Sequence, residues 1–123
     1  MTTSPRIVIV EDEMIIALDL QTRLQRLGCT VLATATSGEE AIRVVAANQP
    51  DLIFMDIGLS GQLDGIDTAA QIHAQAAIPI VFLSAYTDPS TRARMATIMP
   101  SSVIAKPFAD AELLEALRLL PGG

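Results

Sequence analysis

The chain has 123 residues, of which half are hydrophobic and 18% are charged, so it suits one packed domain and excludes a disordered chain. It contains no apolar run of the roughly 20 residues that span a membrane and no signal peptide, so we expect a cytoplasmic protein with no membrane partner. A net charge of −6, with 3% aromatic residues, argues against direct binding to nucleic acid.

Short apolar runs along the chain predict five strands. The runs cover residues 7–10, 30–35, 52–55, 80–83 and 103–105. Most are rich in Val, Ile and Leu and do not alternate with polar residues, which is typical of strands covered on both faces. The pattern therefore favours a parallel sheet over a half-exposed antiparallel one.

A helical pattern follows each apolar run. The first has apolar residues at Ile16, Leu20, Leu24 and Leu27, and Gly28 stops it. The second begins at a capping box formed by Ser37 and Glu40. The third covers residues 65–75. The fourth runs from Asp88 and Pro89 to about Thr97, and the last contains Leu113, Leu117 and Leu120 and ends at residues 121–123.

Five alternations of strand and helix predict an α/β fold with helices on both faces of an open parallel sheet. Right-handed crossovers leave few topologies for such a chain, and the strand order 2-1-3-4-5 is the common doubly wound one. In that order, ligands bind at the carboxyl ends of the first and third strands.

Polar residues that could bind a ligand or take part in a reaction follow four of the predicted strands. Glu11 and Asp12 follow the first, Asp56 the third, Ser84 the fourth and Lys106, the only lysine, the fifth. Taken singly, these are ordinary features: a solvated acidic loop, a turn residue, or a lysine at a sheet edge. Their joint placement at one edge of the sheet favours a functional site.

This set of residues suits phosphoryl chemistry. Three carboxylates close together repel one another unless a cation or proton intervenes, and oxygen ligands favour Mg²⁺. Lys106 offers a compact positive charge and Ser84 a hydroxyl, both suited to phosphoryl oxygens. Asp56 is the candidate nucleophile, because a carboxylate can form an acyl phosphate and a glycine-rich loop follows it.

The chain resembles the receiver domain of two-component response regulators from Ile7 to about Leu120. The matching motifs are Val-Glu-Asp-Glu at residues 10–13, Asp-Leu-Ile-Phe-Met-Asp at 51–56, Asp-Gly at 64–65, Leu-Ser-Ala-Tyr at 83–86 and Lys-Pro-Phe at 106–108. The resemblance implies a flavodoxin-like three-layer sandwich that forms a single receiver domain over residues 1–123, with a core of about 6–120. The 123 residues encode no output domain, so we expect either a stand-alone receiver or the N-terminal part of a longer regulator.

The resemblance also implies the roles of the site residues. Asp56 accepts a phosphoryl group from a phosphohistidine, with Ser84 and Lys106 assisting. Mg²⁺, or Mn²⁺ in its place, is held by the acidic pair Glu11 and Asp12, by Asp56 and by the backbone carbonyl of Gly58. The Lys106–Pro107 peptide bond is typically cis in this family.

The same resemblance implies the partners and the type of activity. The phosphodonor is a histidine kinase or a histidine phosphotransfer protein, and a downstream effector reads the phosphorylated state. Weak or phosphorylation-dependent homodimers are a further expectation. The domain is not an enzyme acting on other substrates, because it catalyses only its own Mg²⁺-dependent phosphorylation and slow dephosphorylation.

Two features depart from the family pattern. The switch residues expected are Ser84 and an aromatic residue three positions before the lysine, but Val103 stands there, and Tyr86 is a candidate substitute. The loop at 57–63 is one residue longer than the common one and has no proline. In the family, the positions of Gly58 and Tyr86 modulate loss of the phosphoryl group through water access.

Two other functions compete with a phosphoacceptor. The first is a pseudo-receiver, a protein-binding module that works without phosphorylation, which Val103 keeps open. The second is another flavodoxin-like or phosphatase-like domain that binds a nucleotide, flavin or phosphorylated substrate. The chain lacks a G-x-G-x-x-G motif after the first strand, a Walker A motif and the Asp-x-Asp-x-Thr pattern at Asp56, which argues against the second.

Overall fold

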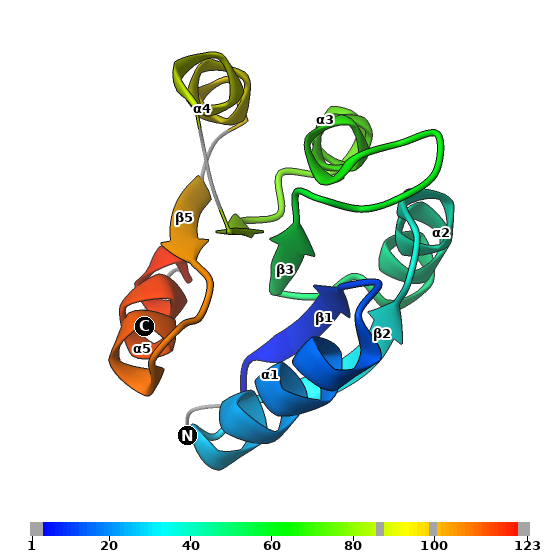
Figure 1. Ribbon diagram of the computed structural model, residues 1–123. Coiled ribbons are helices and arrows are strands. Elements are labelled where there is room, and N and C mark those ends of the chain that lie inside the picture. The colour runs from blue at the N-terminus through cyan, green and yellow to red at the C-terminus, as the bar shows by residue number, and fades with distance from the viewer. Residues whose placement is uncertain (1–3, 86–87, 99–100, 121–123) are drawn as a thin grey trace.

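The computed structural model describes residues 4–85, 88–98 and 101–120. The predicted strands form one parallel sheet in the order β2-β1-β3-β4-β5, which confirms the predicted topology (Figure 1). Their bounds are β1 Arg6–Val10, β2 Thr30–Ala35, β3 Leu52–Asp56, β4 Ile80–Ser84 and β5 Ser101–Ala105.

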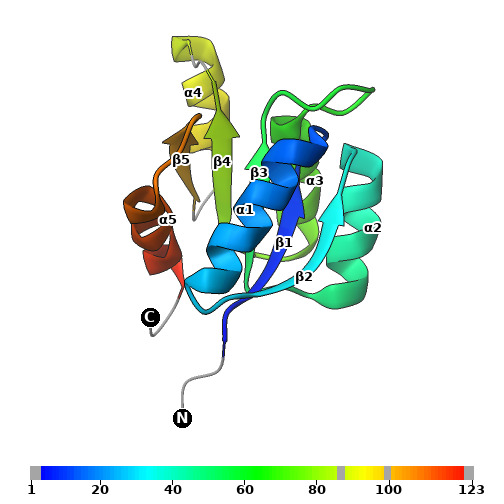
Figure 2. The ribbon, with the colours of Figure 1, turned by 60° about the horizontal axis from the view of Figure 1, so that its bottom comes forward.

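Helices cover both faces of this sheet. Their bounds are α1 Met14–Arg26, α2 Gly38–Asn48, α3 Gly65–Gln75, α4 Pro89–Ala96 and α5 Asp110–Ala116, and a 3₁₀ turn follows at Leu117–Leu119. Figure 2 shows α1 and α5 on one side of the sheet and α2 and α3 on the other. The predicted three-layer α/β sandwich is therefore confirmed. None of the described helices is long and apolar enough to cross a lipid bilayer.

Alternate residues of the central strands supply two separate apolar cores. On β1, Val8 and Val10 belong to the core with α2 and α3, whereas Ile7 and Ile9 belong to the core with α1 and α5. Every residue of β3 and β4 is buried. Burial on both faces explains why these strands are continuous apolar runs rather than alternating ones.

Local signals at the helix ends are confirmed with one correction. Gly28 follows α1 with φ +93°, a conformation that glycine adopts without a Cβ penalty. The Ser37 Oγ atom accepts from the Glu40 backbone N–H at 3.1 Å, as predicted. The second half of the predicted capping box was wrong, because Glu40 Oε1 accepts from the N–H of Thr36 at 2.6 Å and not from that of Ser37. Asp88 caps α4 as predicted.

The last helix differs from its predicted extent. Its α-helical part ends at Ala116, and the next residues form a 3₁₀ turn, the tighter geometry in which helices often finish. The leucine spacing continues through this turn, which is why periodicity alone placed one helix there. Tyr86 and the predicted end at 121–123 lie outside the described residues.

Candidate functional site

The carboxyl ends of the strands bring the predicted site residues to one edge of the sheet. The Lys106 Nζ atom lies 3.0 Å from Glu11 Oε2 and 3.2 Å from Asp56 Oδ1, so one ammonium group bridges two carboxylates. Ser84 ends β4 beside them, where its carbonyl accepts from the Lys106 backbone N–H at 2.8 Å. Residues from the ends of β3 and β4 and from the loops after β1 and β5 thus meet, as predicted.

Glu11 is wholly buried (0% exposed), and both of its carboxylate oxygens accept hydrogen bonds. Its backbone N–H donates to the Ala35 carbonyl at 3.0 Å and continues the strand pairing beyond β1. Its Oε1 accepts from the Glu13 N–H at 3.2 Å, and its Oε2 accepts from Lys106. A buried charge requires such partners, since an unpaired one would cost several kcal/mol.

Burial and the neighbouring charged groups both shift the pKa values of Glu11 and Lys106. Burial raises the pKa of the Glu11 carboxyl and nearby Asp56 adds to this, while the hydrogen bond from Lys106 partly offsets it. Burial by itself would lower the pKa of Lys106, but the bond to Glu11 and the charge of Asp56 outweigh this effect and raise it. Lys106 therefore stays cationic between the two carboxylates at neutral pH.

Glu11, Asp12 and Asp56 form an acidic group that fits a hard divalent cation. One carboxylate oxygen from each lies within 4.8 Å of the others, and all three ligands are oxygens. Mg²⁺ binds such oxygens and commonly keeps several waters, so one or two carboxylates suffice. The Gly58 N–H donates to Asp56 Oδ1 at 3.0 Å, which places Gly58 next to this carboxylate. Its carbonyl as a ligand stays a prediction.

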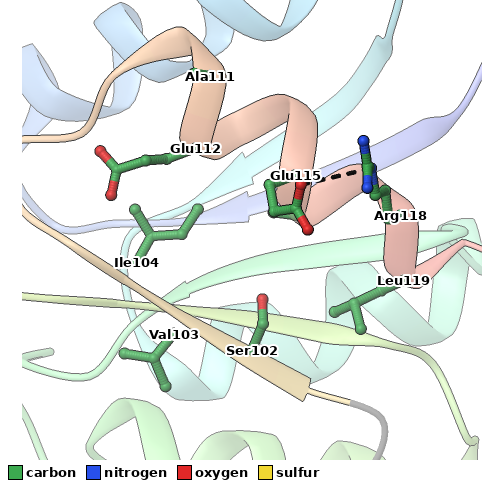
Figure 3. A pocket seen from close by; sticks show the side chains of 9 residues that line it. Ser102, Val103, Ile104, Ala111, Glu112, Glu115, Arg118 and Leu119 are labelled. Atoms are coloured by element: carbon green, nitrogen blue, oxygen red, sulfur yellow. Dashed lines mark ion pairs between the residues drawn. The ribbon is translucent and has the colours of Figure 1, made fainter.

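Asp56 and Ser84 are both buried, at 5% and 4% exposed, in contrast to Val103 at 49%. Figure 3 shows Ser102 and Ile104 on the side of β5 that faces α5, with Val103 on the other side. Val103 borders a hollow of about 510 Å³ between β5 and α4 that Ser84 also lines. No residue of β5 therefore places an aromatic ring in the hollow that Ser84 lines. The switch roles of Ser84, Tyr86 and Val103 stay predictions.

Two contacts of the site were not predicted from the sequence. Ser60 donates to the Asp12 carboxylate, and Arg94 on α4 pairs with Asp64 and Asp67 at the start of α3. For the contact between Ser60 and Asp12, the sequence offered one signal, the extra residue in the loop at 57–63. The Lys106–Pro107 peptide bond is cis, as the resemblance implied.

The family model of the response regulator receiver domain matches residues 7–118. Among curated relatives, the transcriptional regulatory protein PdtaR of Mycobacterium tuberculosis is 36% identical over 116 residues, 93% of this chain and 55% of that protein. The phyllosphere-induced regulator PhyR of Methylorubrum extorquens is 32% identical over 108 residues, 87% of this chain and 40% of that protein. The chain spans about half the length of the first of these relatives.

Solved structures agree with the family match. The signal receiver domain of a modulated diguanylate cyclase from Desulfovibrio desulfuricans is 36% identical, with a TM-score of 0.88 and coverage of 95% of this chain and 93% of that one. The Vibrio cholerae chemotaxis protein CheY4, at 23% identity and a TM-score of 0.86, covers 96% of this chain and 99% of its own, and supports the fold alone. The chain therefore belongs to the receiver domains of two-component response regulators.

Proposed function

We propose that this domain accepts a phosphoryl group on Asp56 from the phosphohistidine of a histidine kinase or histidine phosphotransfer protein. The observation that carries the proposal is the Lys106 ammonium group, which lies 3.0 Å from Glu11 and 3.2 Å from Asp56 beside the acidic group. A cation fixed next to a carboxylate nucleophile and a set of metal ligands suits phosphoryl transfer, in which the protein mainly positions groups and neutralises charge.

The transfer exchanges one bond for another. A carboxylate oxygen of Asp56 attacks phosphorus, the P–N bond to the donor imidazole breaks, and the nitrogen keeps the electron pair. Lys106 neutralises charge on the phosphoryl oxygens, and the Gly58 N–H orients the carboxylate through Asp56 Oδ1. When bound, Mg²⁺ or Mn²⁺ would be held by Glu11, Asp12, Asp56 and the Gly58 carbonyl and would supply further charge neutralisation.

After transfer, the same residues serve the switch and the slow loss of the phosphoryl group. The Ser84 hydroxyl is the candidate hydrogen-bond donor to the phosphoryl group, which would shift an existing equilibrium between inactive and active states. An effector protein or domain, or a second copy of the chain, reads that state. A Cβ at Gly58 would lie 3.5 Å from Asp56 Oδ1, so Gly58→Asn is expected to change the phosphoryl lifetime.

The first experiment follows the intact mass of the protein with acetyl phosphate and Mg²⁺ over time. We expect a transient adduct of one phosphoryl group that disappears in Asp56→Asn and when the metal is chelated. Asp51→Asn is a matched control at the opposite end of the same strand, where Asp51 accepts from the Arg6 N–H at 2.8 Å. Its adduct should form at the rate of the unmodified protein.

The failure of this experiment has a defined meaning. If no adduct forms with acetyl phosphate or with a phosphohistidine donor, the phosphoacceptor function is wrong. The domain is then a pseudo-receiver that binds its partner without phosphorylation, and Asp56→Asn should leave that binding unchanged.

A further inference from the structure

The loop between β3 and α3 reaches across the site to Asp12. The Ser60 hydroxyl donates to Asp12 Oδ2 at 3.1 Å, and the Ser60 backbone N–H donates to the same oxygen at 3.3 Å. The other oxygen, Oδ1, accepts no hydrogen bond from the part of the chain that the structure describes. Among the described residues, one oxygen of the Asp12 side chain therefore accepts hydrogen bonds from the protein and the other accepts none.

The position of Ser60 is set by its two neighbours in the loop. Leu59 is buried in the core with α2 and α3, at 6% exposed, and so anchors the loop immediately before Ser60. Gly61 follows with φ +106°, a conformation that most other residues would adopt only with strain. Ser60 thus lies between a packed side chain and a bend that begins at Gly61, and both neighbours help to set its position.

We propose that Ser60 is a positioning residue that restricts Asp12 to one ligand oxygen and thereby favours Mg²⁺ over Ca²⁺ at this site. The inference rests on the proposed function, because it requires the acidic group to bind a divalent cation. Carboxylate ligands of metals are commonly held by a second hydrogen bond of this kind, and loss of such a bond weakens metal binding.

The selectivity follows from the different demands of the two ions. Mg²⁺ is small, requires near-ideal octahedral geometry and is served by single oxygens of one or two carboxylates. Ca²⁺ is larger, takes more ligands and accepts both oxygens of a carboxylate. Because Ser60 occupies Oδ2 of Asp12, it opposes the two-oxygen mode that Ca²⁺ uses and leaves the one-oxygen mode that Mg²⁺ needs.

The test is a titration of the isotope-labelled domain with Mg²⁺ and separately with Ca²⁺, followed by NMR at the backbone amide of Gly58. This readout reports binding directly and requires no phosphoryl transfer. For Ser60→Ala, we expect the affinity for Mg²⁺ to fall by up to about tenfold, a limited loss because the backbone hydrogen bond to Asp12 remains. We expect the affinity for Ca²⁺ to change less, because the hydroxyl no longer opposes binding through both oxygens of Asp12. The ratio of the two affinities is the quantity of interest.

Two further variants make the result specific. Ser60→Thr keeps the hydroxyl and should preserve the ratio. Ser90→Ala is a matched control, because the Ser90 hydroxyl also donates to an aspartate, Asp88, at 2.9 Å, but at the start of α4. It should leave both affinities unchanged, and thermal unfolding of each variant checks that the fold is intact.

The outcomes separate this inference from the proposed function. If the unmodified domain binds Mg²⁺ and Ser60→Ala leaves the ratio unchanged or binds Mg²⁺ more tightly, the role of Ser60 is wrong and the metal site stands. If both affinities fall by the same factor, Ser60 only supports the fold of the loop, and the selectivity proposal is overturned. If the unmodified domain binds neither ion, the metal site and this inference both fail.

Discussion

The sheet has a densely packed centre and a thinly packed edge, and the functional residues join the two. At the centre, β3 is buried throughout, and α3 buries five residues: Gly65, Ile66, Thr68, Ala69 and Ile72. At the edge, β5 has one buried residue, Ile104, and Met95 is the one residue of α4 that is buried within the described chain. Figure 1 shows α4 set apart from the other helices.

This difference suggests that Asp56 is held rigidly and that α4 and β5 are freer to move. Asp56 ends the fully buried strand β3, and Glu11 and Asp12 follow β1, in which four of five residues are buried, so these strands hold the carboxylates in place. Elements with few buried apolar contacts open at lower free energy than the core, so α4 is the helix that can move without unfolding the domain. The link between them is Arg94, whose Nη2 lies 3.3 Å from Asp64 and 2.9 Å from Asp67.

The largest effect is expected at the centre, for Gly65→Ala. A Cβ at this position would lie 2.0 Å from the Asp56 carbonyl oxygen and 2.7 Å from the Ile57 Cα, so backbone must move. We expect the free energy of unfolding to fall by about 3 kcal/mol, measured by urea denaturation. Gly58→Ala is the control, because its Cβ would make an ordinary contact at 3.5 Å. Equal losses for both variants would contradict the steric explanation.

The second prediction compares valines on the neighbouring strands β4 and β5. Val81 is 0% exposed and Val103 is 49% exposed, so the same deletion of two methyl groups removes very different contacts. We expect Val81→Ala to lower the free energy of unfolding by about 2 kcal/mol and Val103→Ala by less than about 0.5 kcal/mol. Similar values in urea denaturation would mean that the edge is as well packed as the centre.

The third prediction concerns the attachment of α4. Removing the Arg94 guanidinium breaks an exposed ion-pair cluster, so Arg94→Ala should change the global free energy of unfolding by less than about 1 kcal/mol. Amide hydrogen exchange in residues 89–97 should nevertheless become faster, because the ion pairs no longer attach the helix to the start of α3 and Met95 is the one buried residue of α4 in the described chain. Arg118→Ala, which removes a pair with Glu115 on the last turns of the chain, is the control and should leave α4 unchanged. Unchanged exchange in Arg94→Ala would show that the pairs do not hold α4.

The smallest effect is expected from pH at the start of α4. The backbone N–H of Thr91 donates to Asp88 at 2.7 Å and lowers the pKa of that carboxyl below its ordinary value. A lowered folded-state pKa means that the stabilisation is present above the unfolded-state pKa of about 3.9 and is lost as pH falls through the folded-state value.

Amide exchange corrected for its intrinsic pH dependence measures this effect. We expect protection of α4 to decrease below about pH 4 in the unmodified domain and to stay constant in Asp88→Asn, which caps without titrating. Residues 52–55 of β3 are buried and carry no titratable side chain, so their amides are the internal control. A parallel loss of protection in β3 would indicate general acid unfolding instead.

The sequence by itself determined the order of strands and helices and the identity of the residues that meet at Lys106. Unbroken apolar runs occur where strands are covered on both faces, and in a parallel sheet the residues after those runs share one edge. Glu11, Asp56 and Ser84 were therefore predictable from position and chemistry, and the family resemblance added expected roles.

Only the tertiary structure decided the contacts made by long side chains and by the loop after β3. Ser60 reaches Asp12 across 48 positions of the chain because Leu59 is buried beside it, and Arg94 reaches Asp64 because α4 lies near the start of α3. No local pattern encodes such pairs. They depend on how separate elements pack together, whereas strand and helix patterns depend on which face of each element is covered.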